Sequence, residues 1–230
     1  MSSPHSPSPA RSPRPAAAPW TAALSGAAAL ALLLVVAARW SPLMALDRAV
    51  AEALHRHAVT DPGLVKVSRV LTDWVWDPWT MRALIAVAVV VLWWRGARAL
   101  ALWTAATSLL GSLLQQGLKA VVGRERPEWP DPVDSAHYAA YPSGHAMTAV
   151  VSCGLLVWLL RLYDAGAGIR RAALAVAVVS AVGVAATRVY LGVHWLTDVV
   201  GGALLGVAVV ACCALGYARY GAPRRSSASW

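Results

Sequence analysis

The chain has 230 residues, of which 58% are hydrophobic and 13% are charged, and its mean hydropathy is +0.55. Because a soluble domain carries roughly 25% charged residues, this composition excludes an ordinary soluble protein and indicates a membrane protein. The net charge is +9, but the basic residues are scattered between apolar runs, which argues against a nucleic-acid-binding face. The three cysteines lie inside apolar runs without a CxxC spacing, so they predict buried thiols rather than disulfides or zinc ligands.

Both ends of the chain are polar. Residues 1–19 are rich in proline, serine and alanine and predict a disordered tail, and residues 219–230 predict a basic polar tail. The first apolar run, 20–38, is longer than the hydrophobic region of a signal peptide and follows a long polar segment. We therefore expect a retained transmembrane helix here rather than a cleaved leader.

The region 20–218 predicts an all-α domain, a bundle of six transmembrane helices. The six spans are expected at about 20–38, 79–94, 99–118, 144–162, 171–187 and 196–218. The third span is the least apolar, and we expect its polar side chains to face other helices or a cavity, among them Thr104, Ser108, Ser112, Gln115 and Gln116.

Three shorter segments lie between these spans. Residues 45–57 predict an amphipathic helix on the membrane surface, and residues 73–78 carry tryptophans typical of the interface. Residues 119–143 predict a polar loop.

The charge distribution agrees with six spans, which place both termini on one side of the membrane. Half of the lysines and arginines lie on that side with a single acid, Asp164, so this side carries the whole net charge of +9. By the positive-inside rule this side is cytoplasmic. We expect a multi-pass protein of the cell membrane with both termini in the cytoplasm.

Three polar motifs lie at helix ends on the opposite, extracytoplasmic side. They are KAVVGRERP at 119–127, YPSGH at 141–145 and RVYLGVHWLTD at 188–198. Because they share one side of the predicted membrane, these distant segments can meet near the outer interface.

The side chains of these motifs suit phosphate binding. Lys119, Arg126 and Arg188 supply three positive charges, and a guanidinium matches phosphate oxygens bidentately. Ser143 and Gly144 lie where the fourth span begins, and unpaired N–H groups together with the helix dipole favour an anion there. We therefore predict a phosphate site made from these five residues.

Two histidines and one acid could supply the chemistry. Asp198 lies four residues after His194 and could accept its Nδ1 proton, which would leave Nε2 free to attack. His145 is a second imidazole that could protonate a leaving oxygen. Each residue taken alone has a structural explanation, such as an interfacial anchor or a helix cap, but their conjunction favours catalysis. No spacing typical of metal ligands is present, so we expect a reaction without a metal or other cofactor.

The three motifs together resemble the signature of the type 2 phosphatidic acid phosphatase superfamily. That pattern is Lys, six residues, Arg-Pro; then Pro-Ser-Gly-His; then Ser-Arg, five residues, His, three residues, Asp. This chain has Thr187 where the pattern has serine, and the resemblance covers residues 119–198. It implies an integral-membrane lipid phosphatase with a helical bundle and its site at the outer interface. It also implies a covalent phosphohistidine at His194 and His145 as the general acid.

The motifs leave the substrate open among undecaprenyl diphosphate, phosphatidic acid and phosphatidylglycerol phosphate. The expected partners are this lipid phosphate and the bilayer, with no nucleic acid and no indicated oligomeric state. Two alternatives remain: a lipid phosphotransferase, and a non-catalytic lipid-binding or transport protein. The presence of both His145 and His194 argues against the non-catalytic alternative.

Overall fold

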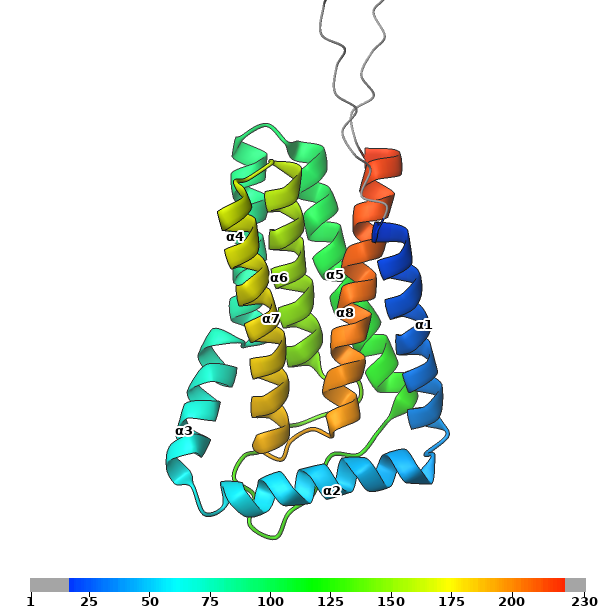
Figure 1. Ribbon diagram of the computed structural model, residues 1–230, viewed down its shortest axis with the longest axis vertical. Coiled ribbons are helices and arrows are strands. Elements are labelled where there is room, and N and C mark those ends of the chain that lie inside the picture. The colour runs from blue at the N-terminus through cyan, green and yellow to red at the C-terminus, as the bar shows by residue number, and fades with distance from the viewer. Residues whose placement is uncertain (1–16, 222–230) are drawn as a thin grey trace, which may run out of the picture.

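Figure 1 shows the computed structural model, which describes residues 17–221. All regular elements within this range are helical, so the predicted all-α class is confirmed. The elements are α1 (Ala17–Ala37), α2 (Ser41–Ala58), α3 (Pro62–Val70), the π-helical turn η1 (Leu71–Val75), α4 (Pro78–Trp94), α5 (Arg98–Val122), α6 (Gly144–Leu162), α7 (Ala167–Tyr190), α8 (Leu196–Gly216) and the π-helical turn η2 (Tyr217–Gly221).

The long helices α1 and α4 to α8 run along the long axis of the molecule, and α2 lies across one end of them (Figure 1). Helix α1 begins and α8 ends at the opposite end (Figure 1). Helix α6 is central because it packs against α4, α5, α7 and α8, and α1 packs against α8. The connection from α5 to α6, residues 123–143, also lies at the α2 end (Figure 1).

Five helical stretches of the described chain are long and apolar enough to cross a membrane. They are Pro19–Ala37, Pro62–Trp94, Gly144–Leu162, Ala167–Tyr190 and Leu196–Gly221. The span predicted at 99–118 is helical, as part of α5, but it is not among these five. Its physical difference is polarity, because α5 buries Thr104, Thr107 and Gln115.

The polar side chains predicted to face inward on α5 divide between two faces. Thr104 and Gln115 are buried in the bundle, but Gln116 is exposed, so the prediction for Gln116 is wrong. Adjacent helical residues point about 100° apart, so neighbouring glutamines cannot both face the same partner. One glutamine therefore packs inside the bundle while the next points outward.

Several predicted boundaries shift by a few residues. Residues 17–19 already belong to α1, so the helix begins before the predicted end of the tail. The fifth span extends from the predicted 171–187 to Ala167–Tyr190, and residues 219–221 belong to η2. The rest of both predicted tails lies outside the described residues. The sequence analysis did not identify α3, whereas the amphipathic helix predicted at 45–57 is present as α2.

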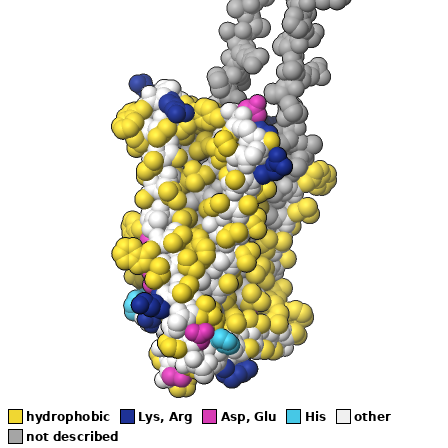
Figure 2. Space-filling model, turned by 60° about the vertical axis from the view of Figure 1, so that its left-hand side comes forward, with side chains coloured by type: hydrophobic (Ala, Val, Ile, Leu, Met, Phe, Trp, Pro, Cys, Tyr) yellow, Lys and Arg dark blue, Asp and Glu magenta, His cyan; other side chains and the backbone are white. Residues whose placement is uncertain are grey.

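The outer surface of the bundle is apolar. Figure 2 shows hydrophobic side chains over its flank and charged side chains mostly toward its two ends. Helix α7 contributes the exposed valines Val176, Val179 and Val182. An apolar belt of this extent suits contact with lipid rather than with water.

Glycines in α8 allow it to approach α6 closely. A Cβ added at Gly202 would lie 2.7 Å from the carbonyl oxygen of Ser143, and one at Gly206 would lie 2.9 Å from the side chain of Val150. Small residues permit such backbone contacts between helices in lipid. This contact brings the beginning of α6 beside the beginning of α8, where two of the three polar motifs lie.

Candidate active site

The three polar motifs meet at the α2 end of the bundle. The backbone N–H of Ser143 donates to the carbonyl of Asp198 at 3.0 Å, which joins the second motif to the third. A guanidinium nitrogen of Arg126 lies 3.2 Å from Nε2 of His194, which joins the first motif to the third. Segments that are 68 residues apart in sequence therefore share one site.

His194 and Asp198 form a buried pair. Nδ1 of His194 lies 3.3 Å from Oδ2 of Asp198, and the two residues are 1% and 0% exposed. The same Oδ2 accepts the backbone N–H of Trp195 at 2.9 Å. Trp195 precedes the first residue of α8, so Asp198 caps this helix while it holds the imidazole. The helix start therefore fixes the orientation of the pair.

Arg126 faces the other nitrogen of the same imidazole. A guanidinium can only donate hydrogen bonds, so its 3.2 Å contact fits an Nε2 that carries a lone pair and no proton. The proton of a neutral imidazole then belongs to Nδ1, opposite Asp198. This is the tautomer in which Nε2 can act as a nucleophile.

The electrostatic surroundings keep His194 neutral. Burial lowers its pKa well below the usual value, and the positive charges of Arg126, Arg188 and Lys119 lower it further. Burial also lowers the pKa of Arg126. A neutral imidazole surrounded by cations is suited to meet an anionic ligand.

Two of the predicted phosphate-binding cations hold the backbone of the 123–143 loop. Arg126 donates to the carbonyls of Tyr138 at 2.9 Å and His137 at 3.1 Å, and Lys119 donates to the carbonyl of Ala139. Three successive carbonyl oxygens thus occupy donors that the sequence analysis assigned to phosphate. Carbonyl and phosphate oxygens are both acceptors, so the two can exchange at these donors.

Other predicted phosphate-binding groups lack partners. The hydroxyl oxygen of Ser143 and Nε of Arg188 are buried without a hydrogen bond to any described residue. A buried polar atom without a partner costs free energy. An anion within hydrogen-bond distance of either atom would supply the missing partner.

Gly144 and His145 begin α6. A Cβ at Gly144 would lie 2.9 Å from Nε2 of Gln115, so the amide of Gln115 on α5 packs against this glycine, a contact that the sequence did not indicate. His145 is half-buried, and no hydrogen bond of its imidazole to another described residue is found. Its side chain is therefore free to meet a ligand.

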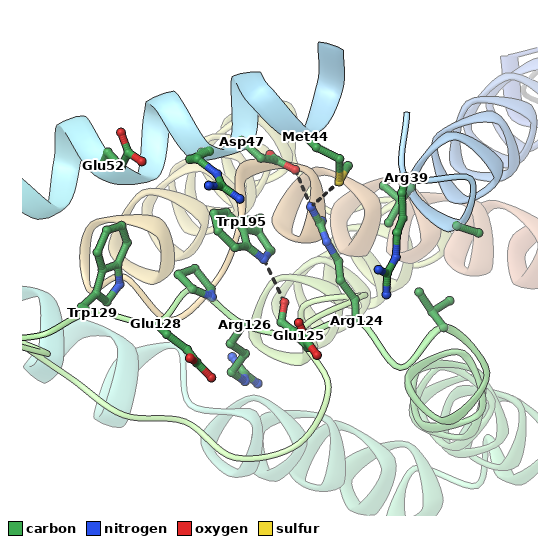
Figure 3. Close-up of a pocket in the computed structure, with 15 residues that line it drawn as sticks. Arg39, Met44, Asp47, Glu52, Arg124, Glu125, Arg126, Glu128, Trp129 and Trp195 are labelled. Atoms are coloured by element: carbon green, nitrogen blue, oxygen red, sulfur yellow. Dashed lines mark hydrogen bonds and ion pairs between the residues drawn. The ribbon is translucent and has the colours of Figure 1, made fainter. Parts of the chain in front are cut away.

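The sequence analysis missed two charged residues beside Asp198. Arg124 donates to Oδ1 of Asp198 at 2.6 Å and to Oδ2 of Asp47 at 2.7 Å, so it bridges two carboxylates. Figure 3 shows Arg124 reaching Asp47 and Met44 of α2. Asp47 shares the buried face of α2 with Ala51 and Ala58, and an acid on an apolar helix face was the available signal.

A cavity of about 460 Å³ opens between the end of α1, α2 and the 123–143 loop (Figure 3). Arg124 and Arg126 line it, but the two histidines of the motifs and Arg188 do not. The cavity therefore lies beside the His194–Asp198 pair and not over it. Among residues 17–221, no group of three histidine, cysteine or acidic side chains is arranged to hold a metal ion.

Comparisons with known proteins identify relatives. The model of the PAP2 superfamily matches residues 98–221, more than half of the chain. Phosphatidylglycerophosphatase B of Bacillus subtilis (strain 168) is 35% identical over 96 residues, 41% of this chain and 47% of that protein. The match thus spans about half the length of this curated relative. The crystal structure of a transmembrane PAP2 type phosphatidylglycerolphosphate phosphatase from Bacillus subtilis has a TM-score of 0.76 at 24% identity. That match covers 90% of this chain and 100% of the solved one, so the two share a fold.

Proposed function

Because this chain belongs to the PAP2 superfamily, as its motifs predicted, we propose that it is a membrane-embedded phosphatase that hydrolyses a lipid phosphate. One observation carries the proposal: the His194 imidazole lies between Asp198 at Nδ1 and Arg126 at Nε2. This arrangement presents a neutral nucleophilic nitrogen beside a permanent cation. It suits attack on phosphorus better than it suits a purely structural histidine.

In the first step, His194 attacks the bound phosphate. The donors that hold the phosphate are Lys119, Arg126, Arg188, Ser143 and the backbone N–H of Gly144. Nε2 of His194 forms a bond to phosphorus while the bond from phosphorus to the leaving oxygen breaks, and His145 gives that oxygen a proton. The proton stays on Nδ1 of His194, where Asp198 accepts a hydrogen bond from it and stabilises the positive charge that develops on the imidazole.

In the second step, water releases the phosphate. His145, now neutral, takes a proton from a water molecule as its oxygen attacks phosphorus. The bond from phosphorus to Nε2 breaks, inorganic phosphate leaves and His194 returns to its neutral form. The fixed donors supply the electrostatic stabilisation in both steps, so the reaction proceeds without a metal ion.

The proposed topology has six transmembrane helices within residues 20–218, flanked by the tails 1–19 and 219–230. It adds α5 to the five apolar stretches, since α5 lies alongside them in the bundle (Figure 1). The excess of arginine at the end where α1 begins and α8 ends supports cytoplasmic termini. The site at the α2 end then faces the extracytoplasmic interface of the cell membrane.

Phosphatidylglycerol phosphate is the first substrate to test, because the names of both relatives describe phosphatases of this lipid. Phosphatidic acid and undecaprenyl diphosphate are the other candidates, since the site residues are common to all three. The experiment uses the full chain, purified in detergent, and compares kcat/KM for phosphate release from each lipid, with and without excess EDTA. The proposal is supported if the wild type releases phosphate in the presence of EDTA and the His194→Ala variant does not.

Three results would contradict parts of it. Absence of phosphate release from every lipid would remove the phosphatase proposal. Loss of activity in EDTA would show that a metal takes part. Transfer of labelled phosphate to an added lipid alcohol, in place of release to water, would identify a phosphotransferase.

A further inference from the structure

We propose that Asp47 of α2 is a positioning residue that sets the charge and orientation of Asp198, and through it His194. The inference rests on the proposed function, because it concerns the same nucleophile. Asp47 does not contact His194. It acts through Arg124 and Thr197, both of which lie next to Asp198 in the structure.

The contacts form one continuous buried chain. Asp47 is bound to Arg124 at 2.7 Å, Arg124 to Asp198 at 2.6 Å, and Asp198 to His194 at 3.3 Å. The exposed fraction is 1% for Asp47, 0% for Asp198 and 1% for His194, and the Arg124 side chain is 12% exposed. Water therefore does little to screen these charges from one another.

Charge explains why the second carboxylate matters. Arg124 carries one positive charge and is shared by two carboxylates, so the three groups together keep one negative charge. That remaining charge lies beside the imidazole, where a positive charge develops during phosphoryl transfer. Without Asp47, the single charge of Asp198 would be matched by Arg124, and little would remain to stabilise the imidazole.

Asp47 also fixes the backbone that carries Asp198. Its Oδ1 accepts the N–H of Thr197 at 2.9 Å, and its Oδ2 accepts the Thr197 hydroxyl at 2.5 Å. The hydroxyl oxygen of Thr197 in turn accepts from Arg124 at 2.6 Å. Both oxygens of Asp47 thus hold the first turn of α8, immediately before Asp198.

Anchoring of α2 does not require this carboxylate. Val50 and Leu54 of α2 pack against the apolar core formed by α4, α6, α7 and α8, and Ala58 belongs to a second apolar cluster. These contacts can hold the helix by burial alone. The acid at position 47 therefore supplies charge to Arg124 and hydrogen bonds to Thr197, which apolar packing cannot.

The test compares Asp47→Asn with Glu52→Gln. Glu52 is an exposed acid on the same helix and makes no ion pair within residues 17–221, so it controls for loss of a carboxylate from α2. We expect Asp47→Asn to lower kcat about 10- to 100-fold, as loss of the groups that orient a metal-bound histidine does, with KM changed less than about threefold. The rate is normalised to the amount of monodisperse protein in detergent, so misfolded protein does not count. A kcat equal to that of Glu52→Gln would overturn the inference.

A double-mutant cycle tests the route through Arg124. If Asp47 acts by sharing Arg124, then Asp47→Asn should have little further effect on kcat in an Arg124→Met protein. That protein lacks the guanidinium that would otherwise neutralise Asp198 once Asp47 is gone. If the fold-loss of kcat in the double variant equals the product of the losses in the two single variants, the route through Arg124 is wrong. If Asp47→Asn does not fold, Thr197→Val takes its place, since it removes the hydroxyl without changing charge. An unchanged kcat in that variant would then overturn the inference.

The wild type and His194→Ala separate this inference from the proposed function. If wild type releases phosphate and His194→Ala does not, the proposed function stands whatever Asp47→Asn shows. If His194→Ala turns over normally, the proposed nucleophile is wrong and the role of Asp47 falls with it.

Discussion

The guanidinium of Arg126 lies 3.2 Å from Nε2 of His194, the nitrogen proposed to attack phosphorus. The same guanidinium donates to the carbonyls of His137 and Tyr138, so the 123–143 loop is tied to the group that faces Nε2 of His194. A phosphate bound for the proposed attack by Nε2 would lie beside this guanidinium. Arg126 would then stabilise the negative charge of the phosphoryl oxygens during transfer.

Arg126→Lys should lower kcat/KM by about 10²- to 10³-fold, the range for loss of one fixed donor to a developing negative charge. Lysine keeps the charge but loses the planar fork that reaches both loop and ligand. The matched control is Arg69→Lys, because Arg69 also donates to a loop carbonyl, that of Val133, outside the proposed site. Steady-state kinetics on one lipid checks both variants. Similar losses of kcat/KM in the two variants would mean that Arg126 only holds the loop and does not act on the phosphate.

His194→Ala should lower turnover by about 10⁴-fold or more, as removal of a nucleophile does in enzymes whose groups act as a unit. The control is His57→Gln. His57 is exposed on α2, and its Nδ1 lies 3.3 Å from the hydroxyl of Tyr190. Labelled phosphate should become attached to wild type and to His57→Gln but not to His194→Ala. Labelling of His194→Ala would show that another group carries the phosphoryl intermediate.

The fold was predictable where hydrophobic pattern alone sets an element. The bounds predicted for the fourth span, 144–162, agree with α6, because Pro142 and Ser143 mark its start and apolar residues fill it. The fifth span, predicted at 171–187, is shorter than α7 (Ala167–Tyr190), which also contains Arg170 and Arg188. Helix α7 continues past them at both ends, since long side chains can reach the interface from within a helix.

The site was predictable where its residues lie within short motifs. His194 and Asp198 are four residues apart, and local helix geometry relates them. The bridge from Asp47 to Arg124 spans 77 residues and depends on how α2 crosses the end of the bundle. Periodicity within one helix contains no such information. The sequence therefore indicated the pair formed by His194, the proposed nucleophile, and Asp198, but not the contact of Asp198 with Arg124 and Asp47.

The pH dependence of kcat/KM should change when a cation near His194 is removed. Its pKa is lowered by burial and by Arg126, Arg188 and Lys119, so Nε2 stays unprotonated well below the usual value of about 6.5. Lys119→Met removes one cation, which raises the pKa of His194 and moves the acid limb of kcat/KM to higher pH. Profiles from about pH 4 to 8 should show this against Lys66→Met, a lysine exposed on α3. A shift to lower pH would contradict the assigned cause.

Gly202→Ala should destabilise the protein by about 1–3 kcal/mol, the range for overpacking a tight contact. Its Cβ would meet the carbonyl oxygen of Ser143 at 2.7 Å and the backbone N of Met147 at 3.3 Å, and backbone atoms of a helix cannot turn aside. Helix α8 would have to move away from α6, which would separate Ser143 from Asp198 and lower activity as well as the unfolding temperature.

The matched control for Gly202→Ala is Gly117→Ala in α5. A Cβ at Gly117 would meet nothing within 4 Å, so this substitution should leave unfolding temperature and kcat near those of wild type. Thermal unfolding in detergent and phosphate release, measured on the same preparations, compare the two. Equal unfolding temperatures for both variants would mean that α8 and α6 are not held at the distance seen here. The proximity of Ser143 to Asp198, on which the proposed phosphate site depends, would then lose its basis.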